Sequence, residues 1–238
     1  MESTLGFRPL YQQVYDLIVS QISDGTYRPG EMLPSEQQLA KQLSVSQGTV
    51  RKALDALTSE KILGRRQGKG TFVTEQTPER SMLRFFGFSR PDGQPLSPKT
   101  SEESIKRRKA TAKELRHLDN GASDEVYEIA RVRMIEGKPM IVEKIVVCAH
   151  MFKGLDEKSP IDTALYTLFQ EKYGVHVIST NDEISATVAT KTDARKIDVE
   201  TGSPLLMIQR STVDIHKKCI EYRTTKVNTK GIIYSARL

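Results

Sequence analysis

Two groups of residues in this chain have types and spacings that suit chemistry, and the first belongs to a helix expected after Ser46. One face of that helix is polar and cationic and carries Gly48, Thr49, Arg51, Lys52 and Asp55. Such a face can enter the major groove of duplex DNA, where an arginine binds guanine in a bidentate way or holds a phosphate. A helix face of this kind taken alone is more often simply solvated, so its neighbours must decide.

A basic, glycine-rich hairpin follows the helix. Residues 62–66 and 71–73 have the pattern of two short strands, and Gln67-Gly68-Lys69-Gly70 joins them. Two glycines around a lysine form a tip whose backbone can lie against phosphates or in the minor groove. Between Lys41 and Val73 seven basic residues stand against two acidic ones, which suits phosphate contact. The helix and the hairpin together predict binding to double-stranded DNA.

The second group lies in the C-terminal part of the chain. Arg131 and Arg133 alternate on one expected strand and so share a face, and Glu143 on the next strand can lie near them. Two arginines on a central strand are costly to bury unless they pair with acids or face an anion. The residues alone leave two interpretations open, an internal salt-bridge network and a site for an anionic ligand.

The sequence contains no recognisable arrangement of catalytic or metal-binding residues. The histidines are scattered among charged or turn segments, at His117, His150, His176 and His216. Cys148 and Cys219 lack metal-ligand spacing and suit small buried residues of a reducing cytosol. A nucleophile elbow, a zinc-binding helix and a phosphate loop are all missing. We therefore expect no catalytic residue, no metal and no cofactor.

Capped amphipathic helices are expected to position the DNA-reading residues. A first helix starts near Pro9, and its expected buried face consists of Leu10, Val14, Leu17, Ile18 and Ile22. A second helix begins at Ser35, where Gln38 completes a Ser-x-x-Gln capping box. A third helix follows Ser46 and buries Val50, Ala53, Leu54 and Leu57. Three helices followed by a hairpin predict a winged helix-turn-helix.

The remaining residues have the pattern of an antiparallel α+β domain. Two strand pairs with hairpin signals, at residues 126–147 and 205–227, stand on either side of a helix expected over residues 163–173. The two halves of this domain also resemble each other.

Elements of the first half recur in the second at nearly constant spacing. Arg131 and Glu143 are echoed by Arg210 and Glu221, and the helical segment from Thr111 is echoed by the one from Thr192. We therefore expect a duplicated helix–strand–strand unit in which Arg131 and Arg210 occupy equivalent sheet positions.

The N-terminal motifs resemble the DNA-binding domain of the GntR family of bacterial transcription regulators. The matching segments are Pro9-Leu10-Tyr11, Leu33-Pro34-Ser35-Glu36, Thr49-Val50-Arg51-Lys52-Ala53-Leu54 and Gly68-Lys69-Gly70-Thr71-Phe72-Val73. The resemblance implies DNA contacts from Ser35, Glu36, Gln37, Gln47, Gly48, Thr49, Arg51, Lys52, Gly68, Lys69, Gly70 and Thr71.

Two positions depart from the pattern of that family. Gln37 and Gln47 stand where the family commonly has arginine. Because glutamine pairs best with adenine, we expect an operator half-site that differs from the family's usual one.

The C-terminal part resembles the effector-binding (UTRA) domain of the HutC subfamily, which has a chorismate-lyase-like fold. The resemblance implies a ligand pocket lined by Gly87, Phe88, Ser89, Arg90, Arg131, Arg133, Glu143, Tyr166, Glu221 and Tyr234. Ala164 stands where the subfamily often has serine, and Ile232-Ile233 replace an Asp-Arg pair. We expect a small anionic metabolite, with a carboxylate preferred to a sugar phosphate.

These features together predict a ligand-responsive transcription regulator of the α+β class. We expect a winged helix-turn-helix domain at residues 1–75, a linker at 76–82, and an effector-binding and dimerisation domain at 83–238. The expected protein is a cytoplasmic homodimer without a membrane segment that represses by binding a palindromic operator. The alternatives are an activator of the same architecture and an enzyme of the chorismate-lyase-like fold.

Overall fold

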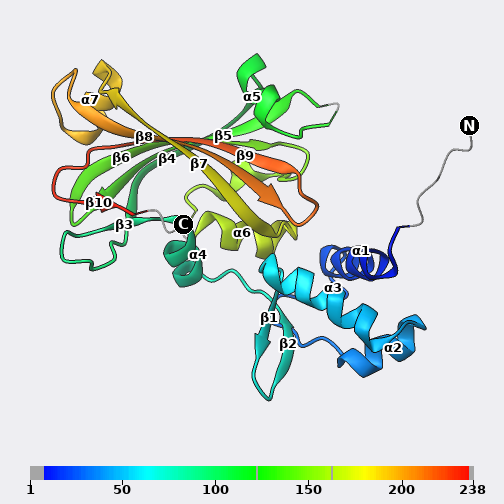
Figure 1. Cartoon of the computed structure of the whole chain (residues 1–238). Coiled ribbons are helices and arrows are strands. Elements are labelled where there is room, and N and C mark those ends of the chain that lie inside the picture. Colours follow the sequence, from blue (N-terminus) through cyan, green and yellow to red (C-terminus); the bar gives the residue numbers. More distant parts are fainter. Residues whose placement is uncertain (1–7, 122, 162, 236–238) are drawn as a thin grey trace, which may run out of the picture.

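The computed structural model describes residues 8–121, 123–161 and 163–235, which form two parts joined by a short connection (Figure 1). The N-terminal part, called the head below, contains α1 (Leu10–Ser23), α2 (Glu36–Leu43), α3 (Gln47–Ser59), β1 (Leu63–Arg66) and β2 (Gly70–Val73). Strands β1 and β2 pair as an antiparallel hairpin, the wing. The prediction of a winged helix-turn-helix is confirmed.

Side-chain caps fix where α2 and α3 begin. The Ser35 hydroxyl accepts from the Gln38 backbone N–H at 3.3 Å, and the Gln38 side chain accepts from the Ser35 N–H at 2.8 Å, so the capping box is confirmed. Ser46 caps α3 by accepting from the Thr49 N–H at 3.1 Å. These bonds satisfy backbone donors that a helix start leaves unpaired.

Helix α1 buries a narrower face than its sequence pattern predicts. Val14, Ile18 and Ile22 are buried, but Leu10 is 57% and Leu17 is 40% exposed. The prediction was wrong for these two leucines because α1 packs mainly against α3, and one helix covers only one stripe of another.

The C-terminal part is built on one six-stranded antiparallel sheet in the order β4-β5-β6-β9-β8-β7. Helices α5 and α7 lie on one face of the sheet, and α4 and α6 lie on the other (Figure 1). Phe152 and Phe169 form the centre of the core beneath the sheet. The elements are α4 (Pro78–Phe85), β3 (Phe88–Ser89), β4 (Lys99–Lys109), α5 (Ala112–His117), β5 (Glu125–Ile135), β6 (Lys138–Cys148), the 3-10 helix η1 (Leu155–Lys158), α6 (Leu165–Tyr173), β7 (Val177–Val188), α7 (Lys191–Ile197), β8 (Pro204–Asp214), β9 (Cys219–Val227) and β10 (Ile233–Tyr234).

The connection from the head to the sheet is short and partly helical. Four residues, Thr74–Thr77, separate β2 from α4, and α4 occupies most of the stretch predicted as a linker. None of the helices in the described part of the chain has the length and hydropathy of a membrane-spanning segment.

The predicted internal duplication is confirmed by strand register. Arg131 lies between Glu103 on β4 and Glu143 on β6, and Arg210 lies between Asp182 on β7 and Arg223 on β9. Arg131 and Arg210 therefore occupy equivalent positions in the two halves.

Two details of the predicted correspondence were wrong. Register makes Arg223, and not Glu221, the counterpart of Glu143, because the two acids were matched by residue type alone. The second helix is capped by Thr190 rather than starting at Thr192, and this cap matches the one that Thr111 provides.

Candidate DNA-reading face and ligand pocket

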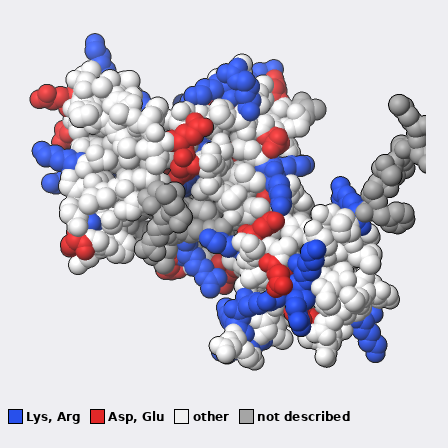
Figure 2. All heavy atoms as spheres, viewed as in Figure 1, with Lys and Arg blue, Asp and Glu red and all other residues white. Residues whose placement is uncertain are grey.

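One face of the head gathers the residues predicted to touch DNA. Figure 2 shows lysine and arginine side chains over α3 and the wing. On α3, Gln47, Gly48, Arg51 and Lys52 are exposed, and Thr49 is half-buried. Because these residues lie within the first two turns of α3, they can reach one groove together.

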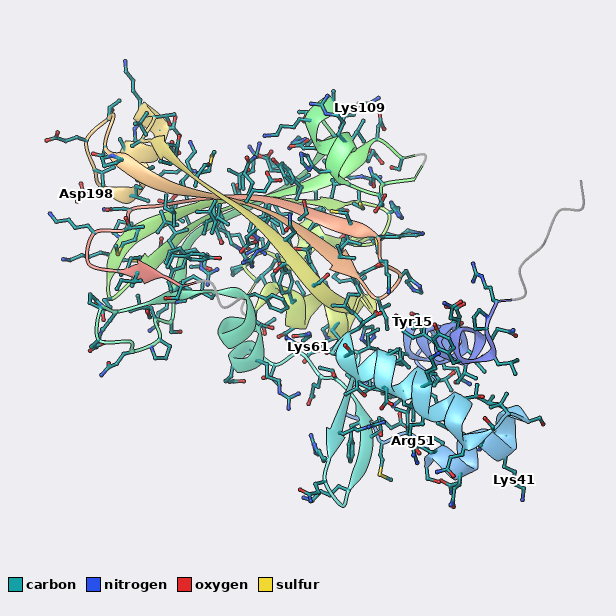
Figure 3. The ribbon with its side chains drawn as sticks, in the orientation of Figure 1. Tyr15, Lys41, Arg51, Lys61, Lys109 and Asp198 are labelled. Carbon is teal, nitrogen blue, oxygen red and sulfur yellow. The ribbon has the colours of Figure 1, made fainter. Side chains whose placement is uncertain are left out.

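The carboxylate of Glu36, in the first turn of α2, connects three side chains of this face. Its Oε2 accepts from Arg51 Nε at 2.9 Å and from Gln47 Nε2 at 3.2 Å, and Arg51 Nη2 lies 2.8 Å from the same oxygen. Arg65 of β1 lies 3.7 Å from Oε1 and forms a closer pair with Asp55 at 2.6 Å. The hydrogen bond from Arg51 lowers the pKa of Glu36, so the carboxylate is ionised at neutral pH. Figure 3 labels Arg51 between α3 and the wing.

The other predicted DNA contacts have distinct positions. Ser35 uses its hydroxyl as the α2 cap, and Gln37 is exposed on α2. The Lys52 ammonium lies 4.0 Å from the centre of the Tyr11 ring on α1.

Positive φ angles shape the tip of the wing. Gly68 has φ 69° and Gly70 has φ 116°, a backbone conformation that side chains rarely tolerate. Lys69 between them is exposed. The carbonyl of Thr71 accepts from the Leu33 N–H at 2.8 Å, which ties the wing to the segment before α2.

A cavity of about 640 Å³ lies under the sheet, between α4, α6 and the strands. Four residues predicted from the sequence line it, Arg131, Arg133, Glu143 and Tyr166. Several other lining residues were not predicted, and the charged ones are Glu79, Lys99, Glu102, Glu103, Arg210 and Arg223. Arg210 could have been found, because the internal duplication already marked it as the counterpart of Arg131.

Six residues predicted for the pocket do not line this cavity. Strand β3 pairs with β10, which places Phe88 against Tyr234 in a separate apolar cluster with Gly87 and Ser89 beside it. Arg90 is exposed and pairs with Glu136. Glu221 is fully buried behind Tyr166, which donates to it at 3.3 Å. The Tyr234 hydroxyl donates to Asp182 at 2.9 Å.

Each of the four cavity arginines is paired with a carboxylate. Two of them lie in the first half of the sheet, where Arg131 binds Glu103 at 2.7 Å and Arg133 binds Glu143 at 3.4 Å. In the second half, Arg210 binds Asp182 at 2.6 Å. Arg223 binds Glu221 at 2.8 Å and Glu143 at 3.5 Å. The internal salt-bridge network that the sequence left open is therefore present.

The network leaves donors without partners. Arg131 Nη2 and Arg133 Nε are buried and have no hydrogen-bond partner among the described residues. Buried polar groups are normally paired, so these N–H groups suit a ligand that accepts hydrogen bonds. Burial alone would raise the pKa of Glu143, but the charges of Arg223, Arg133 and Arg131 lower it, which keeps this carboxylate ionised. The lining residues thus combine cationic donors with ion-paired carboxylates, among them Glu103 and Glu143.

Helix α6 links the cavity to the connection with the head. Its first turn carries Tyr166 in the cavity wall, and one turn later Gln170 accepts from the Gln76 backbone N–H at 2.7 Å. The Gln170 Nε2 donates to the Thr74 carbonyl at 3.1 Å and lies 3.0 Å from His176 Nδ1. Because this nitrogen only donates, His176 Nδ1 must accept, and the ring is neutral.

A second set of contacts joins the β8–β9 turn to the head. Ile215 is buried in the hydrophobic core of the head. His216 Nε2 lies 2.9 Å from Ser23 Oγ on α1, and Lys217 pairs with Glu60 at the end of α3 at 2.8 Å. Tyr15 of α1, labelled in Figure 3, donates to the same Glu60 carboxylate at 2.7 Å.

Comparison with known families matches both parts of the chain. Residues 10–73 match the family described as bacterial regulatory proteins, gntR family, and residues 93–230 match the UTRA domain.

Several relatives are similar along most of their length. The probable fructoselysine utilization operon transcriptional repressor of Escherichia coli K12 is 30% identical over 88% of this chain and 86% of that protein. The transcriptional repressor NagR of Bacillus subtilis 168 is 27% identical over 86% and 84%. The mannosyl-D-glycerate transport/metabolism system repressor MngR of Escherichia coli K12 is 27% identical over 94% of both.

Solved structures show the same fold. PhnF from Mycobacterium smegmatis aligns with a TM-score of 0.55 at 20% identity, over 96% of this chain and 98% of that one. YydK from Bacillus subtilis aligns with a TM-score of 0.54 at 20% identity, over 96% and 99%.

Proposed function

The chain belongs to the GntR family of bacterial regulatory proteins and has a UTRA domain behind its DNA-binding head, and from this premise we propose that it is a ligand-released transcriptional repressor. It binds a palindromic operator as a cytoplasmic homodimer and leaves it when a small anionic metabolite fills the cavity. Three relatives named as repressors support the sign of regulation, and none of these three is named as an enzyme.

The proposed operator contacts are the residues of the DNA-reading face. Gln47, Gly48, Thr49, Arg51 and Lys52 enter the major groove, and the wing tip from Gly68 to Thr71 lies against the adjacent backbone or minor groove. Ser35, Glu36 and Gln37 stand beside the phosphates at the start of α2. A twofold dimer would present two such faces to the two halves of a palindrome.

The proposed effector is a small anion held under the sheet. Arg131 and Arg133 carry unpaired N–H groups, whose hydrogen bonds an anion would accept. Arg210 and Arg223 add positive charge from the second half of the sheet. A carboxylate or phosphate accepts several such bonds at once. One relative is named as a probable repressor of a fructoselysine utilization operon and another as the repressor of a mannosyl-D-glycerate transport/metabolism system, which supports a sugar-derived effector that carries a carboxylate or a phosphate.

The observation that carries this proposal is that α6 and α4 both lie between the cavity and the connection to the head. Both helices line the cavity, α6 through Tyr166 and α4 through Ser81 and Phe85. Gln170 of α6 holds the connection from which α4 starts. A ligand that moves either helix therefore also moves the anchor of the head, and this links the two sites energetically.

A two-step experiment tests the proposal. Mass spectrometry of small molecules retained by the purified protein identifies the effector, and selection from randomised duplexes identifies the operator. The proposal expects operator binding that the retained anion weakens. An operator affinity that is equal or higher with the anion bound contradicts release, and the absence of any preferred duplex contradicts the repressor.

A further inference from the structure

We propose that Glu36 is a positioning residue that determines which bases the recognition helix reads, because it fixes the orientation of both Gln47 and Arg51. This inference rests on the proposed function. It adds the base that each side chain recognises, adenine for Gln47 and guanine for Arg51.

The contact with Glu36 fixes the polarity of the Gln47 amide. An ionised carboxylate accepts hydrogen bonds and donates none, so the atom of Gln47 that lies 3.2 Å from Glu36 Oε2 must be the amide nitrogen. The carbonyl oxygen and the second N–H of Gln47 are left for the groove. An acceptor beside a donor complements the N6 amino group and N7 of adenine.

The same oxygen of Glu36 holds one side of the Arg51 guanidinium. Nε and Nη2 lie 2.9 and 2.8 Å from it, and Nη1 has no hydrogen-bond partner among the described residues. The outer fork of the guanidinium is therefore open, and this fork binds O6 and N7 of guanine. Gln47 and Arg51 are four residues apart on α3, so both edges point to the same groove.

Orientation, and not folding stability, is the role that these contacts favour. The side chain of Arg51 is 59% exposed and that of Glu36 is 23% exposed. Ion pairs with this exposure add little to stability. They do restrict two long side chains before DNA arrives, and such preorganisation reduces the entropy cost of binding. Without Glu36 the amide of Gln47 could rotate and offer either end to a base.

Selection from randomised duplexes with the full-length protein tests this role. Glu36→Gln removes the carboxylate with almost no change of shape. Asp55→Asn is its matched control, because it removes one negative charge from the same face and contacts Arg65 but not Gln47. Both variants should bind non-specific DNA more tightly, since each removes a charge that repels phosphate. Melting temperatures equal to that of the wild-type protein would show that both variants are folded.

The two variants should differ only in base preference. Asp55→Asn should keep the wild-type preferences, and Glu36→Gln should lose at least about fivefold of the discrimination for adenine at one half-site position and for guanine at another. Gln47→Ala and Arg51→Ala identify these two positions separately. Wild-type preferences in Glu36→Gln, or an equal change in Asp55→Asn, would overturn the role of Glu36. A wild-type protein that selects no sequence would instead overturn the proposed function.

Discussion

Tyr166 and Gln170 lie one turn apart on α6, with Tyr166 in the cavity wall and Gln170 hydrogen-bonded to the connection with the head. The Tyr166 hydroxyl lies 3.0 Å from Thr212 Oγ1, and its ring meets Phe85 of α4 edge-on at 4.8 Å. A ligand would contact α6 at Tyr166, and the head is connected to α6 at Gln170. Both therefore act on the position of the same turn of this helix.

Removal of the Gln170 amide should uncouple the cavity from the head. In Gln170→Leu the buried Gln76 N–H loses its acceptor, which should cost about 1–3 kcal/mol of stability. We expect this variant to bind both operator and effector. Binding at one of two coupled sites typically changes the affinity of the other by about 5–150-fold. In Gln170→Leu the effector should no longer change operator affinity to this extent. Operator titrations with and without effector measure this change.

Thr167→Val is the matched control for Gln170→Leu. Thr167 is buried on the same helix, and its hydroxyl has no hydrogen-bond partner in the described structure. The control should keep the full effector response. An unchanged response in Gln170→Leu, or an equal loss in Thr167→Val, would show that the connection is not the route of coupling.

Acid should destabilise the protein through His176. Burial, helped by the charge of His216, lowers the pKa of His176 to about 4. The ring must therefore stay neutral in the folded state. Its contribution to the free energy of unfolding is complete above pH 6.5 and is lost as the pH falls from there towards 4. The loss should approach about 3 kcal/mol, the value of a shift of this size. Urea unfolding at pH 7.5 and pH 4.5 measures it.

His176→Gln should flatten that pH dependence, because glutamine does not titrate. The control is His150→Gln, since His150 is exposed. The control should retain the wild-type loss of stability in acid. An identical pH dependence in wild type and His176→Gln would mean that other groups cause the acid sensitivity.

Arg133 and Arg90 distinguish the cavity from the loop that sequence resemblance also assigned to it. Arg133 lines the cavity with an unpaired buried Nε, whereas Arg90 is exposed and paired with Glu136. Arg133→Gln should weaken effector binding by about 10–100-fold, the value of a hydrogen bond to a charged group, and should leave operator binding intact. Isothermal titration calorimetry with the retained anion measures this affinity.

Arg90→Gln should keep the wild-type effector affinity. If Arg90→Gln loses binding and Arg133→Gln does not, the ligand lies at the β3 loop and the cavity assignment is wrong.

Local patterns predicted the head well because its elements are set by neighbouring residues. The Ser35 and Gln38 capping box and the buried stripe of α3 are short-range features, and both were confirmed. The exposure of Leu10 and Leu17 depends on what α1 packs against, which periodicity does not reveal.

The cavity was predicted only in part because distant strands build it. Arg131 and Arg133 were visible as a pair on one strand, but Glu103 and Arg223 join them through sheet register. The role of Gln170 was not visible at all, since a single glutamine on an amphipathic helix usually faces solvent. Its partners Thr74 and Gln76 lie more than ninety residues away.

The most direct test of the account is the affinity of the full-length protein for its selected operator, measured with and without the anion that it retains. We predict that saturating anion weakens operator binding by at least about fivefold, and that Arg133→Gln no longer responds at the same concentration. An operator affinity that stays the same or rises while calorimetry shows the anion bound would contradict a ligand-released repressor.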